Sequence, residues 1–347
     1  MEAIVANLKE QYAQLKAEGP IRIREAAKQL GVSEVDLLVL GCGETVTRLR
    51  PEFKEILGQI ESLGYVMALT RNDEVVHERK GVYLNGDFSN PHAQLFVGKD
   101  IDLRIFLSAW KSAFSVTEMN GDKPRYSLQF FAKDGSAVHK IYMQETSNME
   151  KYHELVASFK ADDQSQTEEV DRTEKAPEME MPDDQIDAKG FQEAWLALKD
   201  THEFYGMLRK FRVTRTQALR LAPEGEYAQK MDHLVLRRTL DLSAERQVPI
   251  MVFVGNPGMI QIHSGEVKNI VDHGPFINVL DPEFNLHLKE GAIDQAWIVR
   301  KPTEDGIITS LELFNEKKEL ICTLFGARKP GIPELESWRG VMKDVII

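Results

Sequence analysis

The chain contains an internal repeat of about half its length, and this repeat limits the folds that it can adopt. Residues 127–131 read SLQFF, and residues 310–314, about 183 positions later, read SLELF. Residues 30–33 (LGVS) correspond to residues 211–214 (FRVT) at an offset of about 181. Small loop insertions account for the difference between the two offsets. A repeat of this length predicts two domains built on one plan and not a solenoid of short units. Differences between the two halves then mark where the chemistry is to be sought.

The composition is that of an ordinary globular protein. The 347 residues, 42% hydrophobic and 28% charged, suffice for two domains with separate apolar cores. A net charge of −12 disfavours a nucleic-acid partner or an anionic membrane. The two cysteines, Cys42 and Cys322, form no disulfide framework, no apolar run approaches the ~18–20 residues of a membrane span, and the N-terminus lacks a secretory signal. We therefore expect a soluble cytoplasmic protein without membrane insertion.

Each half opens and closes with a helical pattern and carries short strand-like runs between. Apolar residues recur at three-to-four spacing over residues 23–38 and 191–219, and helices are also predicted at 149–159 and 333–342. Residues 307–314 are typical of the strands, with β-branched and apolar side chains. This order predicts an α+β fold: a tandem duplication in which each half is a large antiparallel sheet with flanking helices.

An acidic segment is expected to join the two halves. Between residues 161 and 188 there are eleven acidic residues, two basic residues and no aromatic residue. Such a composition buries too little apolar surface to order itself, which predicts a flexible linker. The predicted domains are therefore an N-terminal repeat at residues 1–160, the linker at 161–189 and a C-terminal repeat at 190–347.

Sequence signatures of the common enzyme classes are absent. There is no phosphate-binding Gly-Lys-Ser/Thr loop, no Gly-x-Gly-x-x-Gly after a strand and no Gly-x-Ser-x-Gly. Paired cysteines, His-Glu-x-x-His and Cys-x-x-Cys-His are absent too, which excludes a covalently attached haem and disfavours a zinc site.

Residues 24–40 (REAAKQLGVSEVDLLVL) resemble a helix-turn-helix, with Gly31 in the turn and Ser33 capping the second helix. That second helix carries acidic residues and no Lys or Arg, so it would repel phosphate groups. The repeat places a second copy of the motif at residues 207–221, which favours a packing unit. One possible function is therefore a regulatory module that binds protein or DNA through residues 24–40 and binds no haem. We keep it as the alternative to the ligand-binding function considered next.

Residues 199–209 (KDTHEFYGMLR) are the most suggestive stretch for a ligand site. Asp200 and Glu203 read as a capping box with Asp200 as the N-cap, which places His202 in the first helical turn. The positive end of the helix dipole favours a neutral imidazole, the form that binds metal. Four basic residues follow, namely Arg209, Lys210, Arg212 and Arg215. A neutral His, apolar neighbours and basic groups suit haem, while a half-buried helix-start histidine beside solvated arginines is the alternative interpretation.

The chain resembles the cytoplasmic haemin-degrading factors, or haem-trafficking proteins, of Gram-negative bacteria. The resemblance runs nearly end to end and rests on the duplicated plan and on five stretches. These are residues 98–106 (GKDIDLRIF), 200–204 (DTHEF), 249–258 (PIMVFVGNPG), 297–303 (WIVRKPT) and 325–331 (FGARKPG). In this order and spacing they form a specific combination.

The resemblance implies one non-covalently bound haem (iron protoporphyrin IX) in a cleft of the second half, bordered by the first. The family's axial histidine falls on His202 and its distal, catalytic arginine on Arg104. Four further positions match haem-pocket residues: Arg215 and Lys301, suited to propionates or ordered water, Phe253, packing on the macrocycle, and Arg328. Phe325 stands where family members often carry a tyrosine.

The implied role is haem iron utilisation in the cytoplasm. The protein would either degrade haem oxidatively with an electron donor and release iron, or carry haem to a separate haem oxygenase. A haem importer is a further implied partner. These residues do not decide between enzyme and carrier, nor whether the first half binds a second haem through His77.

Overall fold

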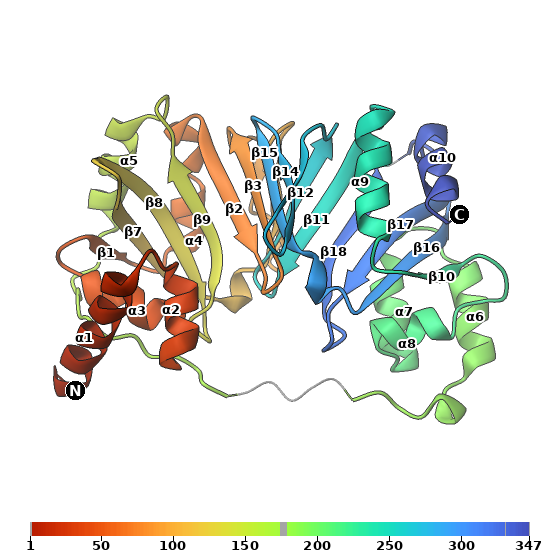
Figure 1. The fold of residues 1–347 in the computed structure, drawn as a ribbon, viewed down its shortest axis with the longest axis horizontal. Coiled ribbons are helices and arrows are strands. Elements are labelled where there is room, and N and C mark those ends of the chain that lie inside the picture. The colour runs from red at the N-terminus through yellow and green to blue at the C-terminus, as the bar shows by residue number, and fades with distance from the viewer. Residues whose placement is uncertain (1, 174–178, 330, 347) are drawn as a thin grey trace. The chain divides into compact units, whose positions relative to one another are not determined.

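The computed structural model describes residues 2–173, 179–329 and 331–346 (Figure 1). These residues form two compact units. The first unit contains residues 2–71, 78–173 and 255–261, and the second contains residues 72–77, 179–254 and 262–346. Each unit therefore includes a short segment from the other half of the chain, an exchange that the sequence pattern did not predict.

The first half of the chain supplies five helices and nine strands among the described residues. The helices are α1 (Glu2–Glu18), α2 (Ile23–Leu30), α3 (Glu34–Leu38), α4 (Phe53–Leu57) and α5 (Met149–Phe159). The strands are β1 (Val46–Leu49), β2 (Val66–Arg71), β3 (Val75–Gly81), β4 (Gly86–Asp87), β5 (Gln94–Val97), β6 (Asp102–Ile105), β7 (Trp110–Asn120), β8 (Lys123–Ala132) and β9 (Ala137–Met143). The 3-10 turns are η1 (Val39–Gly41), η2 (Ile60–Leu63) and η3 (Leu107–Ala109).

The second half repeats this composition in its described part. The helices are α6 (Ala188–Leu196), α7 (Glu203–Phe211), α8 (Arg215–Arg220), α9 (Val235–Glu245) and α10 (Glu336–Asp344). The strands are β10 (Ala228–Met231), β11 (Ile250–Asn256), β12 (Met259–Gly265), β13 (Ile270–His273), β14 (Phe276–Leu280), β15 (Phe284–Lys289), β16 (Gln295–Thr303), β17 (Gly306–Phe314) and β18 (Leu320–Gly326). The 3-10 turns are η4 (Asp183–Gln185) and η5 (Glu290–Ala292).

Strand pairing confirms the predicted duplication. The first unit contains the antiparallel order β1-β7-β8-β9-β2 and the hairpin series β4-β5-β6. The second unit contains the matching orders β10-β16-β17-β18-β11 and β13-β14-β15. Ser127 pairs with Tyr142 in the first unit, and its repeat partner Ser310 pairs with Phe325 in the second. The α+β fold of antiparallel sheets with flanking helices is therefore confirmed.

The main sheet of the second unit is covered by helices on both faces. Because side chains alternate along a strand, Ile298 and Leu311 face the core that contains α9 and α10. Trp297 and Val299 face the opposite core, which contains α6, α7 and α8. The two groups of helices are visible in Figure 1. The face beneath α7 and α8 carries Lys301 of β16, a predicted ligand residue.

The helix-turn-helix segment has the predicted local form but is buried. Gly31 ends α2 with φ 66°, and Ser33 caps α3 by accepting a hydrogen bond from the N–H of Asp36. Four of the five residues of α3 are buried: Glu34, Val35, Leu37 and Leu38. In the second unit Thr214 caps α8 in the same way. The motif is a packing unit in both halves.

The acidic segment predicted as a linker makes specific contacts on both sides of residues 174–178, which lie outside the described residues. Gln164 accepts a hydrogen bond from the backbone N–H of Arg48 at 2.9 Å and donates one to the Arg48 carbonyl at 3.0 Å. In the second unit, hydrogen bonds from Arg220 are the main reason why the pKa of Glu180 is lowered to about 2. Composition alone did not predict these contacts.

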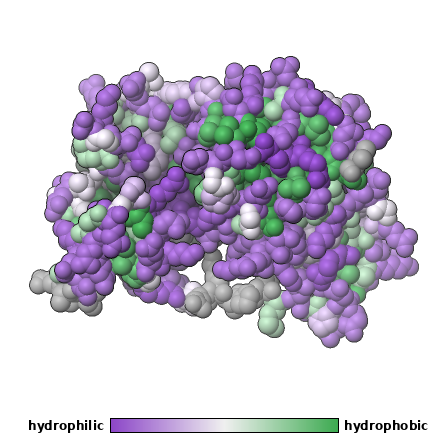
Figure 2. All heavy atoms as spheres, viewed as in Figure 1, coloured by the Kyte–Doolittle hydropathy of each residue, from purple (hydrophilic) through white to green (hydrophobic). Residues whose placement is uncertain are grey.

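The view in Figure 2 shows a largely hydrophilic surface with scattered hydrophobic groups. In the part of the chain that the structure describes, no helix is both long enough and apolar enough to cross a membrane.

Candidate functional site

His202 lies immediately before α7 and is exposed. The predicted N-cap, Asp200, is wrong, since His202 itself occupies that position with φ −70° and ψ −25°. The predicted contact between Asp200 and Glu203 is nevertheless present: Glu203 accepts the backbone N–H of Asp200 at 3.3 Å, and also that of Lys199 at 2.8 Å, in the turn before the helix. The His202 side chain is 91% exposed, so its imidazole is open to a ligand.

Asp200 determines which imidazole nitrogen of His202 is available. One carboxylate oxygen of Asp200 accepts the His202 backbone N–H at 2.7 Å and lies 2.6 Å from Nδ1. The backbone hydrogen bond is the main cause of the lowered pKa of Asp200, and Arg328 lowers it further. An ionised carboxylate only accepts, so Nδ1 is the donor in this contact and Nε2 is the nitrogen left to bind a metal. This is the arrangement of a metal-binding histidine.

Two predicted basic residues, Arg215 and Lys301, meet at a buried carboxylate that was not predicted. Glu312 on β17 is 0% exposed and accepts hydrogen bonds from Nε of Arg215 at 2.8 Å and Nζ of Lys301 at 2.7 Å. Ser310 donates a third at 3.2 Å. The Lys301 ammonium also lies 4.3 Å from the centre of the Phe204 ring. We call these four residues, Arg215, Lys301, Glu312 and Phe204, the basic cluster.

The charges of the basic cluster shift one another's pKa values. Burial alone would raise the pKa of Glu312, but Arg215 and Lys301 outweigh it and hold that pKa far below its ordinary range. Burial lowers the pKa of Lys301, and the positive charge of Arg215 adds to this effect. Burial also lowers the pKa of Arg215, but the charge and the hydrogen bond of Glu312 raise that pKa by more, so the net shift is upward. The cluster keeps one net positive charge, which suits an anionic group.

The related position in the first unit carries the opposite charge. The repeat offset of about 181 places Glu34 of α3 opposite Arg215 of α8. Glu34 is 5% exposed and accepts a hydrogen bond from Lys140 at 2.6 Å, together with an ion pair to Arg71. Arg215 keeps a side-chain exposure of 27%. The second unit thus presents a partly accessible cation where the first presents a buried anion.

Phe253 lies beside a second aromatic residue, and Arg328 lies near the His202 turn. The rings of Phe253 on β11 and Phe325 on β18 are 5.1 Å apart in an edge-to-face arrangement, and neither is fully buried. Arg328 forms an ion pair with Asp305 and donates to the carbonyl of Ile332 at 3.2 Å. These residues add an apolar aromatic surface and a guanidinium group to the second unit.

Arg104 belongs to the first unit. It lies on β6, pairs with Asp102, and its side chain is 33% exposed. Burial raises the pKa of Asp102, while Arg104 opposes that rise. The guanidinium group is therefore partly neutralised and partly accessible.

His77 packs inside the second unit and has no exposed surface. It lies on β3, is 0% exposed, and its ring centre is 5.0 Å from that of Phe284. His263, its loose repeat partner, stacks on the same phenyl ring at 3.7 Å. Among the described residues, no group of three His, Cys, Asp or Glu side chains could hold a metal ion. Because the His77 side chain is fully buried, the structure does not support a second haem site at this residue.

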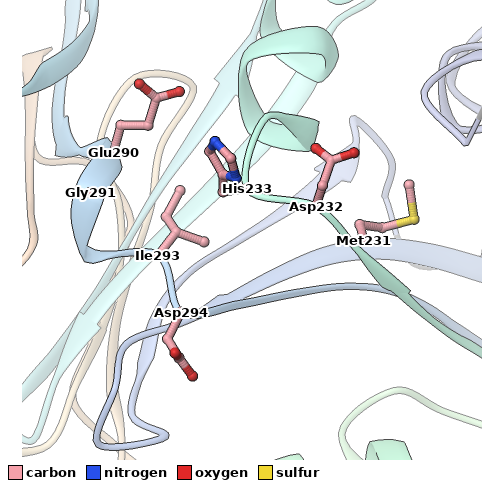
Figure 3. Close-up of a pocket in the computed structure, with 7 residues that line it drawn as sticks. All are labelled: Met231, Asp232, His233, Glu290, Gly291, Ile293 and Asp294. Atoms are coloured by element: carbon pink, nitrogen blue, oxygen red, sulfur yellow. The ribbon is translucent and has the colours of Figure 1, made fainter.

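A separate hollow of about 570 Å³ lies elsewhere in the second unit (Figure 3). It is lined by Met231, Asp232, His233, Glu290, Gly291, Ile293 and Asp294, none of which was predicted as a ligand residue. The Asp232 carboxylate already accepts two hydrogen bonds from Arg238, each 3.1 Å long. A site with three carboxylates does not suit an anionic ligand, so we place the candidate site at His202.

Glu312 is the main functional candidate that sequence reasoning missed. The repeat contained a signal for it, because Glu312 stands where the first half has Gln129. A charged residue on a core-facing strand position requires a buried partner. The partners themselves could not be read from the pattern.

An exposed imidazole with a fixed tautomer, a partly exposed aromatic pair and a net positive cluster on a duplicated α+β fold define a protein suited to bind haem. Comparison with known proteins agrees. The sequence profile of the haemin-degrading HemS.ChuX domain matches residues 31–159 and 212–345. The chain belongs to this haemin-degrading HemS/ChuX family.

Relatives match over almost the whole chain. The hemin transport protein HmuS of Yersinia pestis is 38% identical over 337 residues, covering 96% of both chains. The structure of holo-PhuS, a heme-binding protein from Pseudomonas aeruginosa, is 44% identical with a TM-score of 0.93 and covers 97% of both chains. The structure of ChuS, an E. coli heme oxygenase, is 32% identical with a TM-score of 0.88 and covers 98% of this chain and 100% of that one.

Proposed function

We propose that this protein binds one haem through Nε2 of His202 and serves haem iron utilisation in the cytoplasm. The observation that carries the proposal is the contact between His202 and Asp200, 2.6 Å long, on an otherwise exposed imidazole. It leaves a lone pair on the exposed ring for iron. Haem supplies the iron and the redox chemistry, while the protein supplies position and polarity.

The basic and aromatic residues of the second unit support the proposal. The basic cluster is suited to haem carboxylates because it combines a partly exposed guanidinium with a net positive charge. Phe253 offers an aromatic surface for the macrocycle. Arg328 is proposed as a further pocket residue because it pairs with Asp305. The preceding residue, Glu304, donates its backbone N–H to the carbonyl of Lys199 at 2.9 Å, three residues before His202. Arg104 of the first unit is proposed as the distal, catalytic arginine. The Arg104→Ala variant described below tests this role.

The direct test is a haemin titration followed by the Soret band. Wild-type protein is expected to give a saturable one-to-one shift, and His202→Ala to bind at least about tenfold more weakly with an altered band. His233→Ala is the matched control, because His233 is also exposed but lines the separate hollow. Equal titrations for wild type and His202→Ala would refute the axial role, and no shift in wild type would refute haem binding.

A second arm determines what becomes of the bound haem. After loading, a reductant is added under air with catalase present. Decay of the Soret band that slows in Arg104→Ala indicates oxidative degradation with release of iron. A stable band, followed by transfer to an added haem oxygenase, indicates a carrier. The relatives named above include both a transport protein and an oxygenase.

The alternative, a regulatory module built on residues 24–40, is not favoured by the packing of α3. Glu34 anchors this helix to β9 through Lys140, and Val35, Leu37 and Leu38 are buried as well. A helix whose side chains are used in this way has no free face for a DNA groove.

A further inference from the structure

Gly206 lies in the interior of α7, and the fold gives no reason for a glycine there. Its backbone is not among the positive-φ positions of the chain, and a Cβ atom added to it would meet no atom within 4 Å. Elsewhere the fold does require glycine: a Cβ at Gly98 would lie 2.9 Å from the backbone oxygen of Ile101, and one at Gly326 would lie 2.6 Å from the Trp338 side chain. Glycine weakens a helix relative to alanine, so its presence at position 206 calls for another reason.

The position of Gly206 relative to His202 supplies that reason. The two residues are four apart, and His202 already has helical φ and ψ, so they lie on one face of α7 with a rise of about 6 Å between them. A helical side chain leans toward the N-terminus and covers the preceding turn. A side chain at position 206 would therefore project toward the turn that carries His202.

The neighbours of Gly206 leave this gap open. Tyr205 is 64% exposed, and the guanidinium of Arg209 lies 5.7 Å from the centre of its ring. The side chains of Tyr205 and Arg209 thus contact each other and cover the surface of α7 next to Gly206. Because Asp200 holds Nδ1 of His202, the ring edge that carries Nε2 faces away from that carboxylate.

We propose that Gly206 is a specificity-determining position that keeps the Nε2 side of His202 open to a broad planar tetrapyrrole. The inference rests on the proposed function, in which His202 binds haem iron. Alanine or leucine at this position would stabilise the helix but reduce the room for the macrocycle. Stability and haem affinity therefore change in opposite directions.

The test compares Gly206→Leu and Gly206→Ala with the matched control Gly340→Ala. Gly340 lies within α10, and a Cβ there also meets nothing within 4 Å. Each variant is titrated with haemin and unfolded in urea without haem. We expect Gly206→Leu to bind haemin at least about tenfold more weakly, with Gly206→Ala between it and wild type. The urea midpoints of both alanine variants should rise, and Gly340→Ala should bind haemin as wild type does.

The outcomes separate this inference from the proposed function. If Gly206→Leu binds haemin within about twofold of wild type while His202→Ala does not, the role of Gly206 is refuted and haem binding stands. If Gly206→Leu loses affinity and its urea midpoint also falls, the loss reflects damage to α7 and the inference is likewise refuted. If wild type gives no Soret shift, both proposals fail.

Discussion

Replacing Glu312 with glutamine removes the negative charge that holds two cations in the interior of the second unit. Glutamine keeps nearly the same volume and one carbonyl oxygen, so the packing on β17 is preserved. Lys301, which is 4% exposed, then loses the carboxylate that its ammonium contacts at 2.7 Å. The ammonium must lose its proton, move toward solvent or remain buried without a counter-ion.

The size of the effect follows from the burial of these groups. Breaking a buried ion pair by removing one partner costs about 3–5 kcal/mol. Arg215 is 27% exposed and can recover part of its hydration, and the amide oxygen still accepts one hydrogen bond. We therefore expect the free energy of unfolding to fall by about 3 kcal/mol, the lower end of that range.

Urea unfolding followed by tryptophan fluorescence measures this change. Three of the four tryptophans belong to the second unit, namely Trp195, Trp297 and Trp338, so the signal reports mainly on the unit that contains Glu312. With an m value of about 1–3 kcal/mol per molar urea, the midpoint should fall by about 1–3 M. The double variant Lys301→Met/Glu312→Gln is the control, because it removes the stranded ammonium and should recover most of the loss.

The dependence on pH gives a second check. The pKa of Glu312 is far below its ordinary range in the folded protein, so its stabilising effect is fully present above the unfolded pKa of about 4.3 and is lost as the pH falls toward the folded pKa. The difference between wild type and Glu312→Gln should be constant from about pH 6 to 8 and shrink below about pH 4. A midpoint shift under about 0.3 M at pH 7, or a difference that grows in acid, would refute the ion-pair reasoning.

Two further substitutions test the site and the core. Asp200→Ala removes the carboxylate that holds Nδ1 of His202 and should weaken haemin binding by about 10–100-fold in the Soret titration. Unchanged affinity would show that Asp200 does not orient the imidazole for binding. Tyr83→Phe removes a hydroxyl that lies 2.6 Å from Nε2 of the buried His139, whose Nδ1 contacts Thr70 at 2.9 Å. Leaving that nitrogen without a partner should cost about 1–3 kcal/mol in urea unfolding, and a neutral result would show that the ring finds another partner.

Local features of the chain could be predicted because they depend on neighbouring residues. The pattern predicted the helix at residues 149–159, and α5 spans Met149–Phe159. Ser33 caps α3 as predicted, since a cap joins groups three residues apart. The N-cap of α7 was misplaced by two residues because the side chain of Glu203 forms a turn before the helix begins. Helix ends depend on such side-chain contacts, which periodicity does not contain.

The sequence by itself determined the duplication and the α+β class, and it made His202 the first candidate ligand, because repeats, periodicity and short motifs can be read from the order of residues along the chain. Tertiary structure decided how the residues of the candidate site are arranged. Arg215 and Glu312 are 97 positions apart in the chain, and only the pairing of β16 with β17 and the packing of α8 on that sheet bring them together with Lys301. The charge of a residue can be read from a sequence, but whether it is free or neutralised depends on which distant side chain faces it across the folded core.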